Sequence, residues 1–61
     1  MIKTIEISSG IKRLINIATG RDVLIAQEGG KWLMIANAFQ ADAHQELGWF
    51  RTVQECKQAI A

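Results

Sequence analysis

Apolar and polar positions alternate through the first half of the chain, and glycines divide that half into short segments. Gly10, Gly20 and the Gly29–Gly30 pair separate runs that are rich in Ile, Val and Leu. Strands with turn residues at such spacing are typical of an antiparallel sheet, because parallel strands need a long crossover between them. The pattern therefore predicts a β-meander with strands at residues 2–8, 22–27 and 31–37.

Residues 11–18 fit two patterns. As a strand, the segment places Ile11, Arg13, Ile15 and Ile17 on one side. As a helix, it aligns apolar residues at i, i+3, i+4 and i+7, between an N-cap Ser9 and a C-terminal Gly20. The β-branched isoleucines favour a strand, so we expect a fourth strand here. The alternative is a β-α-β-β-α order.

The composition changes after residue 37. Residues 38–48 are rich in Ala and Gln and contain no β-branched residue. They fit either a short helix that carries Phe39, Ala43 and Leu47 on one side and ends at Gly48, or an ordered loop.

A capping box follows at Thr52–Glu55, in which the Thr hydroxyl and the Glu carboxylate each accept a hydrogen bond from a backbone N–H of the first helical turn. It predicts a C-terminal helix that begins here, with Trp49 and Phe50 at its entry. The expected inner positions of this helix are Val53, Cys56, Ala59 and Ile60.

These elements predict an α+β fold, an antiparallel meander of three or four strands with one C-terminal helix packed on one face. The chain of 61 residues has room for a single small domain at 1–61. One face collects mostly β-branched residues, and we expect it to be the core. Its members are Ile5, Ile7, Ile15, Ile17, Val23, Ile25, Leu33 and Ile35.

The second face is expected to be apolar as well, although antiparallel sheets commonly turn one polar face to water. Either residues 38–50 fold back and cover it, or another chain does. Its members are Leu14, Ala18, Leu24, Ala26, Trp32, Met34 and Ala36.

Charge and cysteine content narrow the function classes. Seven Lys and Arg against six Asp and Glu give a net charge of +1, and the sequence pI of about 7.9 is below the range typical of nucleic-acid-binding domains.

Cys56 is the one cysteine, so the chain has no internal disulfide. There is no signal-peptide pattern at Met1–Ile5 and no apolar run long enough to span a bilayer, so we expect a cytoplasmic protein without membrane contact.

Few residues suggest a catalytic or metal-binding role. Asp42, His44 and Glu46 occupy alternate positions, which on a strand would place three possible metal ligands on one side, but such spacing is common in polar segments. A catalytic pair of His44 and Cys56 would need hydrogen-bond contact, an orienting third group and a substrate cleft, and a chain this short has little room for a cleft. We expect no catalytic residue, no metal and no cofactor.

The sequence therefore favours a small non-catalytic protein–protein interaction module, an inhibitor, adaptor or regulator that forms a homodimer. The predicted contact surface is the second sheet face or an exposed edge strand. Its contact residues are Leu24, Trp32 and Met34, with Arg13 and Lys31 as a polar rim. The alternative is a single-stranded nucleic-acid-binding protein that uses Trp32 beside Lys31 and Arg13.

Overall fold

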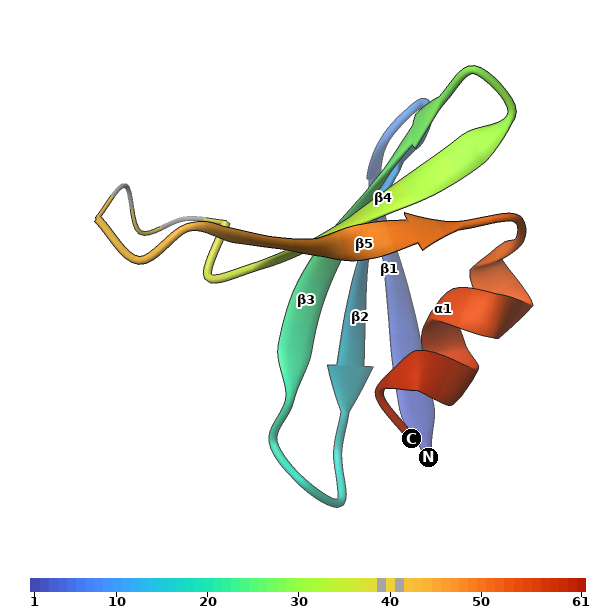
Figure 1. The fold of residues 1–61 in the computed structure, drawn as a ribbon. Coiled ribbons are helices and arrows are strands. Elements are labelled where there is room, and N and C mark those ends of the chain that lie inside the picture. The colour runs from blue at the N-terminus through green and yellow to red at the C-terminus, as the bar shows by residue number, and fades with distance from the viewer. Residues whose placement is uncertain (39, 41) are drawn as a thin grey trace.

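Five strands and one helix form in the part of the chain that this computed structural model describes, residues 1–38, 40 and 42–61. The strands pair antiparallel in the order β1-β2-β3-β4-β5 (Figure 1). The α+β meander with a C-terminal helix is thus confirmed, whereas the expected number of three or four strands is wrong. The elements are β1 (Ile2–Ser8), β2 (Ile11–Asn16), β3 (Asp22–Glu28), β4 (Lys31–Ala36), β5 (Gln45–Phe50) and α1 (Val53–Ala59).

The ambiguous segment is strand β2. It pairs with β1 on one side and with β3 on the other, so Arg13 lies between Ile5 and Leu24. The alternative β-α-β-β-α order is therefore wrong. The β-branched isoleucines favour the extended backbone that the two neighbouring strands require.

Strand β5 is the element that the sequence pattern missed. It lies where a short helix or loop was expected, and Phe39 of that expected helix lies outside the described residues. Met34 faces Gly48 whereas Ile35 faces Glu46, so Leu47 is an extra residue in a bulge. The bulge interrupts the alternation by which a strand is identified in a sequence.

The β3–β4 hairpin turns at Gly29 and Gly30 as predicted. Their φ angles of 58° and 81° are both positive, which is the conformation of a type I′ turn and one that glycine adopts without strain. Glu28 then faces Lys31, and the register of the two central strands follows from this turn.

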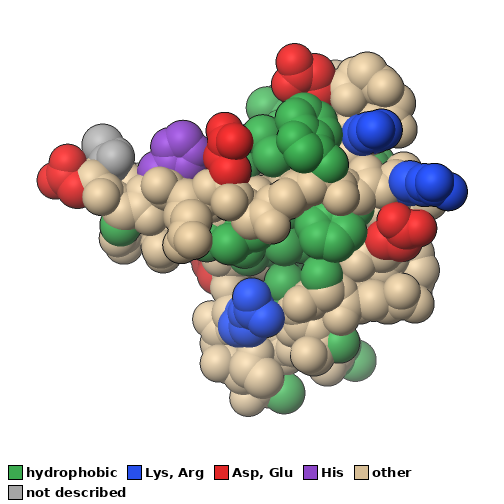
Figure 2. All heavy atoms as spheres, in the orientation of Figure 1, with side chains coloured by type: hydrophobic (Ala, Val, Ile, Leu, Met, Phe, Trp, Pro, Cys, Tyr) green, Lys and Arg blue, Asp and Glu red, His purple; other side chains and the backbone are tan. Residues whose placement is uncertain are grey.

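The sheet twists strongly, so that β5 crosses in front of β1, β2 and β3 (Figure 1). Helix α1 lies on the same side as β5, and the two chain ends lie close together (Figure 1). Figure 2 shows this side, where hydrophobic side chains reach the surface beside β5 with charged side chains around them.

The core lies between α1 and the inner side of the sheet. Ile2, Phe50 and Val53 pack at its margin. Its buried members, each at most 8% exposed, are Leu14, Val23, Ile25, Trp32, Met34, Cys56 and Ile60.

The expected division of the two faces is wrong. The expected core face was made of the odd-numbered residues of each strand. A two-residue hairpin instead pairs an odd-numbered residue of one strand with an even-numbered residue of the next, as Ile25 pairs with Met34, so both lie on the same face. Of the expected core face, Val23 and Ile25 belong to the buried cluster. Ile7 and Ile17 are exposed, and Ile5, Ile15, Leu33 and Ile35 are partly exposed.

The predicted cap begins α1. The Thr52 hydroxyl accepts a hydrogen bond from the Glu55 amide at 3.1 Å, and the Glu55 carboxylate accepts one from the Arg51 amide at 3.1 Å. Cys56 and Ile60 face the core as expected, but Ala59 is exposed.

Asn16 connects the end of α1 to the sheet. This side chain is 4% exposed, and its Nδ2 donates to the carbonyl of Ile60 at 2.7 Å. Its Oδ1 accepts from the amides of Ala18 and Thr19 in the β2–β3 turn. One buried amide thus joins the turn to the helix C-terminus.

Candidate interaction surface

The side of the sheet away from α1, here called the open face, is lined mainly by apolar side chains. The strand registers place alternate residues of all five strands on it. Seven of its eight apolar residues are partly exposed, and the eighth, Trp49, is 50% exposed. The eight are Ile5, Ile11, Ile15, Leu24, Ala26, Leu33, Ile35 and Trp49.

Four of these residues form a continuous apolar row across β2 to β5. Ile11 faces Ala26, Ala26 faces Leu33, and Leu33 faces Trp49. Directly paired side chains on one face lie about 5 Å apart, so the row is in contact along its length. Ala26 has the smallest side chain of the row, and Trp49, two strands away, has the largest.

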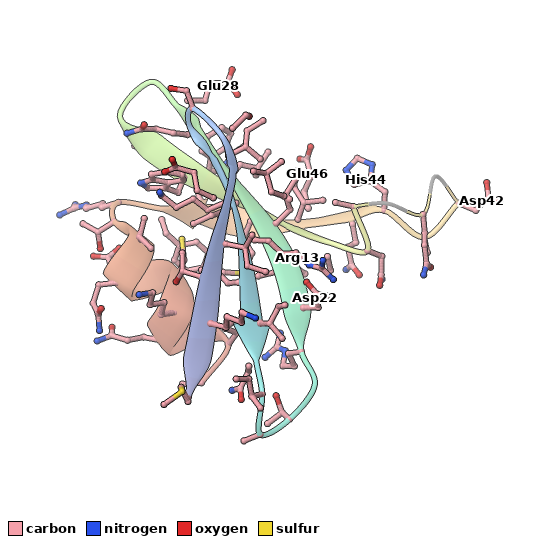
Figure 3. All side chains as sticks on the ribbon, turned by 180° about the vertical axis from the view of Figure 1, so that it is seen from behind. Arg13, Asp22, Glu28, Asp42, His44 and Glu46 are labelled. Atoms are coloured by element: carbon pink, nitrogen blue, oxygen red, sulfur yellow. The ribbon has the colours of Figure 1, made fainter. Side chains whose placement is uncertain are left out.

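Charged residues lie around this row, and their signs balance. By register, the charged residues on the open face are Lys3, Arg13, Lys31, Asp22, Glu28 and Glu46. Figure 3 shows the molecule from behind, with Arg13 and Asp22 next to each other. Three positive and three negative charges leave the face without net charge.

Arg13 and Asp22 form a bidentate ion pair across β2 and β3. The Arg13 Nε donates to Oδ1 of Asp22 at 2.9 Å and to Oδ2 at 3.2 Å, and Nη2 also donates to Oδ2. The hydrogen bond from Arg13 is the main cause that lowers the pKa of Asp22. The pair is fixed in geometry but open to water, since both side chains are over a third exposed.

A small hollow of about 210 Å³ lies at the Asp22 end of the open face. Such a volume is below the roughly 300 to 1,000 Å³ of ordinary small-molecule sites. The geometry therefore favours a flat contact over an enclosed ligand. The hollow is lined by Arg13, Asp22, Val23, Leu24, Asn37, Ala38 and Gln40.

The residues predicted for partner contact do not share one surface. Leu24 and Arg13 face each other on the open face. Trp32 and Met34 lie beneath α1 and are 8% and 1% exposed. Lys31 is exposed beside the hairpin turn and shares the open face by register. The predicted contact residues are thus divided between the two faces, because the face assignment of β4 was shifted by one residue.

The alternative nucleic-acid surface is also not assembled. Base stacking needs an exposed aromatic face. Trp32 is buried in the core, and Arg13 lies on the opposite side of the sheet. The structure therefore does not bring Trp32 together with Lys31 and Arg13 on one surface.

Asp42, His44 and Glu46 are exposed and are spread along the segment that leads into β5 (Figure 3). Within residues 1–38, 40 and 42–61, no three His, Cys, Asp or Glu side chains cluster as metal ligands do. Cys56 is fully buried, and burial is the main cause that raises the pKa of its thiol.

No family model, curated protein or solved structure matches this chain. No helix in the described part of the chain has the length and apolar character needed to cross a membrane. The argument on function therefore depends on the geometry of the open face.

Sequence reasoning missed Leu33, Ile35 and Trp49 as members of this surface. The signal was present in the Gly29–Gly30 turn, since a two-residue hairpin fixes which β4 residues share a face with Leu24. No comparable signal places Trp49, because the bulge at Leu47 shifts the pairing of β5.

Proposed function

We propose that this chain is a small, non-catalytic protein–protein interaction module of the cytoplasm, an adaptor, inhibitor or regulator that binds through its open face. The observation that carries the proposal is the apolar row from Ile11 to Trp49, which ends in a half-exposed tryptophan. Contiguous apolar patches on a small protein commonly mark an interaction site.

The amino-acid types on the open face resemble those of protein interfaces. Such interfaces combine an apolar centre, aromatic residues and Arg with a polar rim. Here Trp49 and Leu33 supply the centre, and Arg13 and Asp22 lie beside it. The Arg13–Asp22 pair holds both side chains in one geometry, so little freedom remains to be lost when a partner binds.

The charge of the face favours a protein partner over a nucleic acid. Binding to phosphates draws on several unbalanced cations. On the open face, the positive charges of Lys3, Arg13 and Lys31 are balanced by Asp22, Glu28 and Glu46. A face of this kind attracts an apolar, neutral surface more than a polyanion.

Site-specific photo-crosslinking in cells tests the proposal. A crosslinking amino acid replaces Trp49 or Leu24 on the open face, and Ile17 serves as the control because it is 60% exposed but lies outside the strands. We expect the same protein adduct from Trp49 and Leu24 and none from Ile17. A charged substitution at Leu33 should abolish the adduct. Equal labelling from all three positions, or no adduct from the open face, would contradict the proposal.

A further inference from the structure

We propose that the side of β1 away from β2, here called the free edge, binds an extended segment of a partner protein, which joins the sheet antiparallel to β1. In this mode of peptide recognition, main-chain hydrogen bonds supply affinity and alternate side chains supply specificity. The inference goes beyond the proposed function, because the edge of the sheet is a different surface from the open face and is tested separately.

The backbone groups of β1 that point to the free edge follow from the hydrogen-bond pattern at the start of the strand. The Ile17 amide donates to the Met1 carbonyl at 3.1 Å, in the register of the β1–β2 ladder. Hydrogen-bonded pairs alternate along an antiparallel ladder, so Lys3 and Ile5 also direct their N–H and C=O groups to β2. The residues whose backbone groups point to the free edge are Ile2, Thr4 and Glu6.

The pairing of β2 with β3 gives the same alternation independently. The Gln27 amide donates to the Gly10 carbonyl at 2.7 Å, and the Asn16 amide donates to the Arg21 carbonyl at 2.8 Å. Every second residue of β2, counted from Gly10 to Asn16, therefore directs its backbone groups to β3. The residues between them are left to pair with β1, in agreement with the pattern at the start of β1.

Of the two edge strands of the sheet, β1 has the more regular backbone. The bulge at Leu47 interrupts β5 and breaks the even spacing of donors and acceptors that an added strand needs. The register of β1 is unbroken from Ile2 to Glu6 and shifts only after Glu6. Thr4 is exposed, and the Glu6 side chain is 69% exposed. The stretch from Ile2 to Glu6 is therefore the part of the sheet edge that is best suited to strand addition.

The side chains of β1 define the chemistry of the partner segment. Residues opposite Lys3 and Ile5 form the pairs without hydrogen bonds, in which side chains lie closest. Within residues 1–38, 40 and 42–61, Lys3 forms no ion pair. An acidic residue is therefore favoured opposite Lys3, and a β-branched apolar residue is favoured opposite Ile5. In an antiparallel segment the apolar residue precedes the acidic residue by two positions.

A second copy of β1 fits this pattern poorly. The backbone groups at the free edge belong to even-numbered residues in both copies, so odd-numbered residues face odd-numbered residues. Glu6 is the one acidic residue of β1, and it could not lie opposite Lys3. The charge of the edge therefore favours a segment of a different protein.

Selection from a displayed library of random short peptides tests the inference on the full chain. We expect enriched peptides with the apolar-x-acidic pattern that bind the wild type more tightly than about 100 µM. Thr4→Pro should weaken their binding at least about tenfold, because the ring removes an amide donor from the free edge and occupies the place of a partner carbonyl. Thr4→Val is the matched control, since it keeps the amide and should bind like the wild type.

Lys3→Glu tests the predicted charge preference. It should lower the affinity of the enriched peptides about fivefold, because two like charges then lie opposite each other. A new selection on this variant should replace the acidic residue of the pattern by a basic one. Enriched peptides that carry the same acidic residue after both selections would overturn the assigned partner chemistry.

Far-UV circular dichroism first checks that Thr4→Pro folds, as expected for a proline on the outer side of an edge strand. If Thr4→Pro does not fold, amide hydrogen exchange of the wild type decides. Bound peptide should slow exchange at the Thr4 and Glu6 amides and leave the amides of β5 unchanged. Peptides that bind Thr4→Pro with unchanged affinity, or that protect β5 instead, overturn the inference. A selection that enriches no peptide overturns it as well.

Discussion

The two faces of this sheet carry similar apolar side chains, yet one is buried and the other is not. Met34 is 1% exposed, whereas the neighbouring residues Leu33 and Ile35 on the same strand are partly exposed. The difference is the cover that α1 provides, since Cys56 and Ile60 pack only on the inner side. Hydrophobicity alone therefore does not identify the core of a two-faced sheet. The position of the covering helix does.

A helix of seven residues depends on its surroundings to fold. Here the Thr52 cap fixes its start, and Asn16 holds its C-terminus through the Ile60 carbonyl. These polar contacts place the helix on the inner face. On the open face, the loop residues Asn37, Ala38 and Gln40 line the hollow beside Asp22.

The largest expected effect comes from two adjacent truncations on β4. Met34→Ala should lower the free energy of unfolding by about 2 to 5 kcal/mol, because it leaves a cavity in the core. Leu33→Ala should cost less than about 1 kcal/mol in dilute solution, since Leu33 already contacts water. Urea denaturation followed by circular dichroism measures both. Equal losses of unfolding free energy in the two variants would contradict the distinction between a buried inner face and an exposed open face.

Asn16→Ala comes second, with an expected loss of about 1 to 3 kcal/mol. The substitution leaves the Ile60 carbonyl and two turn amides without their side-chain partner. Asn16→Asp is the informative companion, because it retains the acceptor for the turn but loses the donor to Ile60. The midpoint temperature of thermal unfolding should be higher for the wild type than for either variant. A fully stable Asn16→Ala protein would show that α1 is held without this contact.

Thr52→Ala should cost about 1 kcal/mol, because it removes the acceptor for the Glu55 amide at the start of α1. Gln54→Ala, at an exposed position in the same helical turn, is the control and should change stability little. Chemical denaturation of the two variants side by side gives the difference. Identical midpoints would indicate that the cap contributes nothing measurable to the cover of the inner face.

The smallest effect is expected on the open face itself. Hydrogen bonding from Arg13 lowers the pKa of folded Asp22, so the pair contributes stability above the unfolded pKa of about 3.9 and loses it as the pH falls through the lowered value. Asp22→Asn should therefore cost below about 0.5 kcal/mol at pH 7, since water screens the pair, and nothing near pH 2. Denaturation curves at the two pH values test this. A larger loss of stability from Asp22→Asn at pH 2 than at pH 7 would contradict the predicted pH dependence.

Local signals in the sequence predicted local structure well. The Gly29–Gly30 hairpin, strand β2 and the Thr52 cap all follow from short-range preferences of backbone and side chain. The assignment of faces failed because it depends on how neighbouring strands align. A shift of one residue moves a strand's whole apolar set to the opposite side, and Trp32 and Met34 were misplaced in this way.

The candidate surface was only partly predictable for the same reason. Leu24 and Arg13 were identified, and the structure places both on the open face. Trp49 was assigned to the entry of the helix, because the bulge at Leu47 hides the alternation of β5. An interface assembled from five strands depends on four registers, and each register has to be known before the members of a face can be named.

The most direct test compares solvent access to the two faces of the sheet. A soluble paramagnetic agent broadens the NMR signals of exposed groups, so the Met34 methyl, the Leu33 methyls and the Trp49 indole report on the inner and open faces. The account predicts that the Met34 signal is protected, whereas the Leu33 and Trp49 signals are broadened in dilute solution. Leu33 and Trp49 signals that are as well protected as the Met34 signal would contradict it.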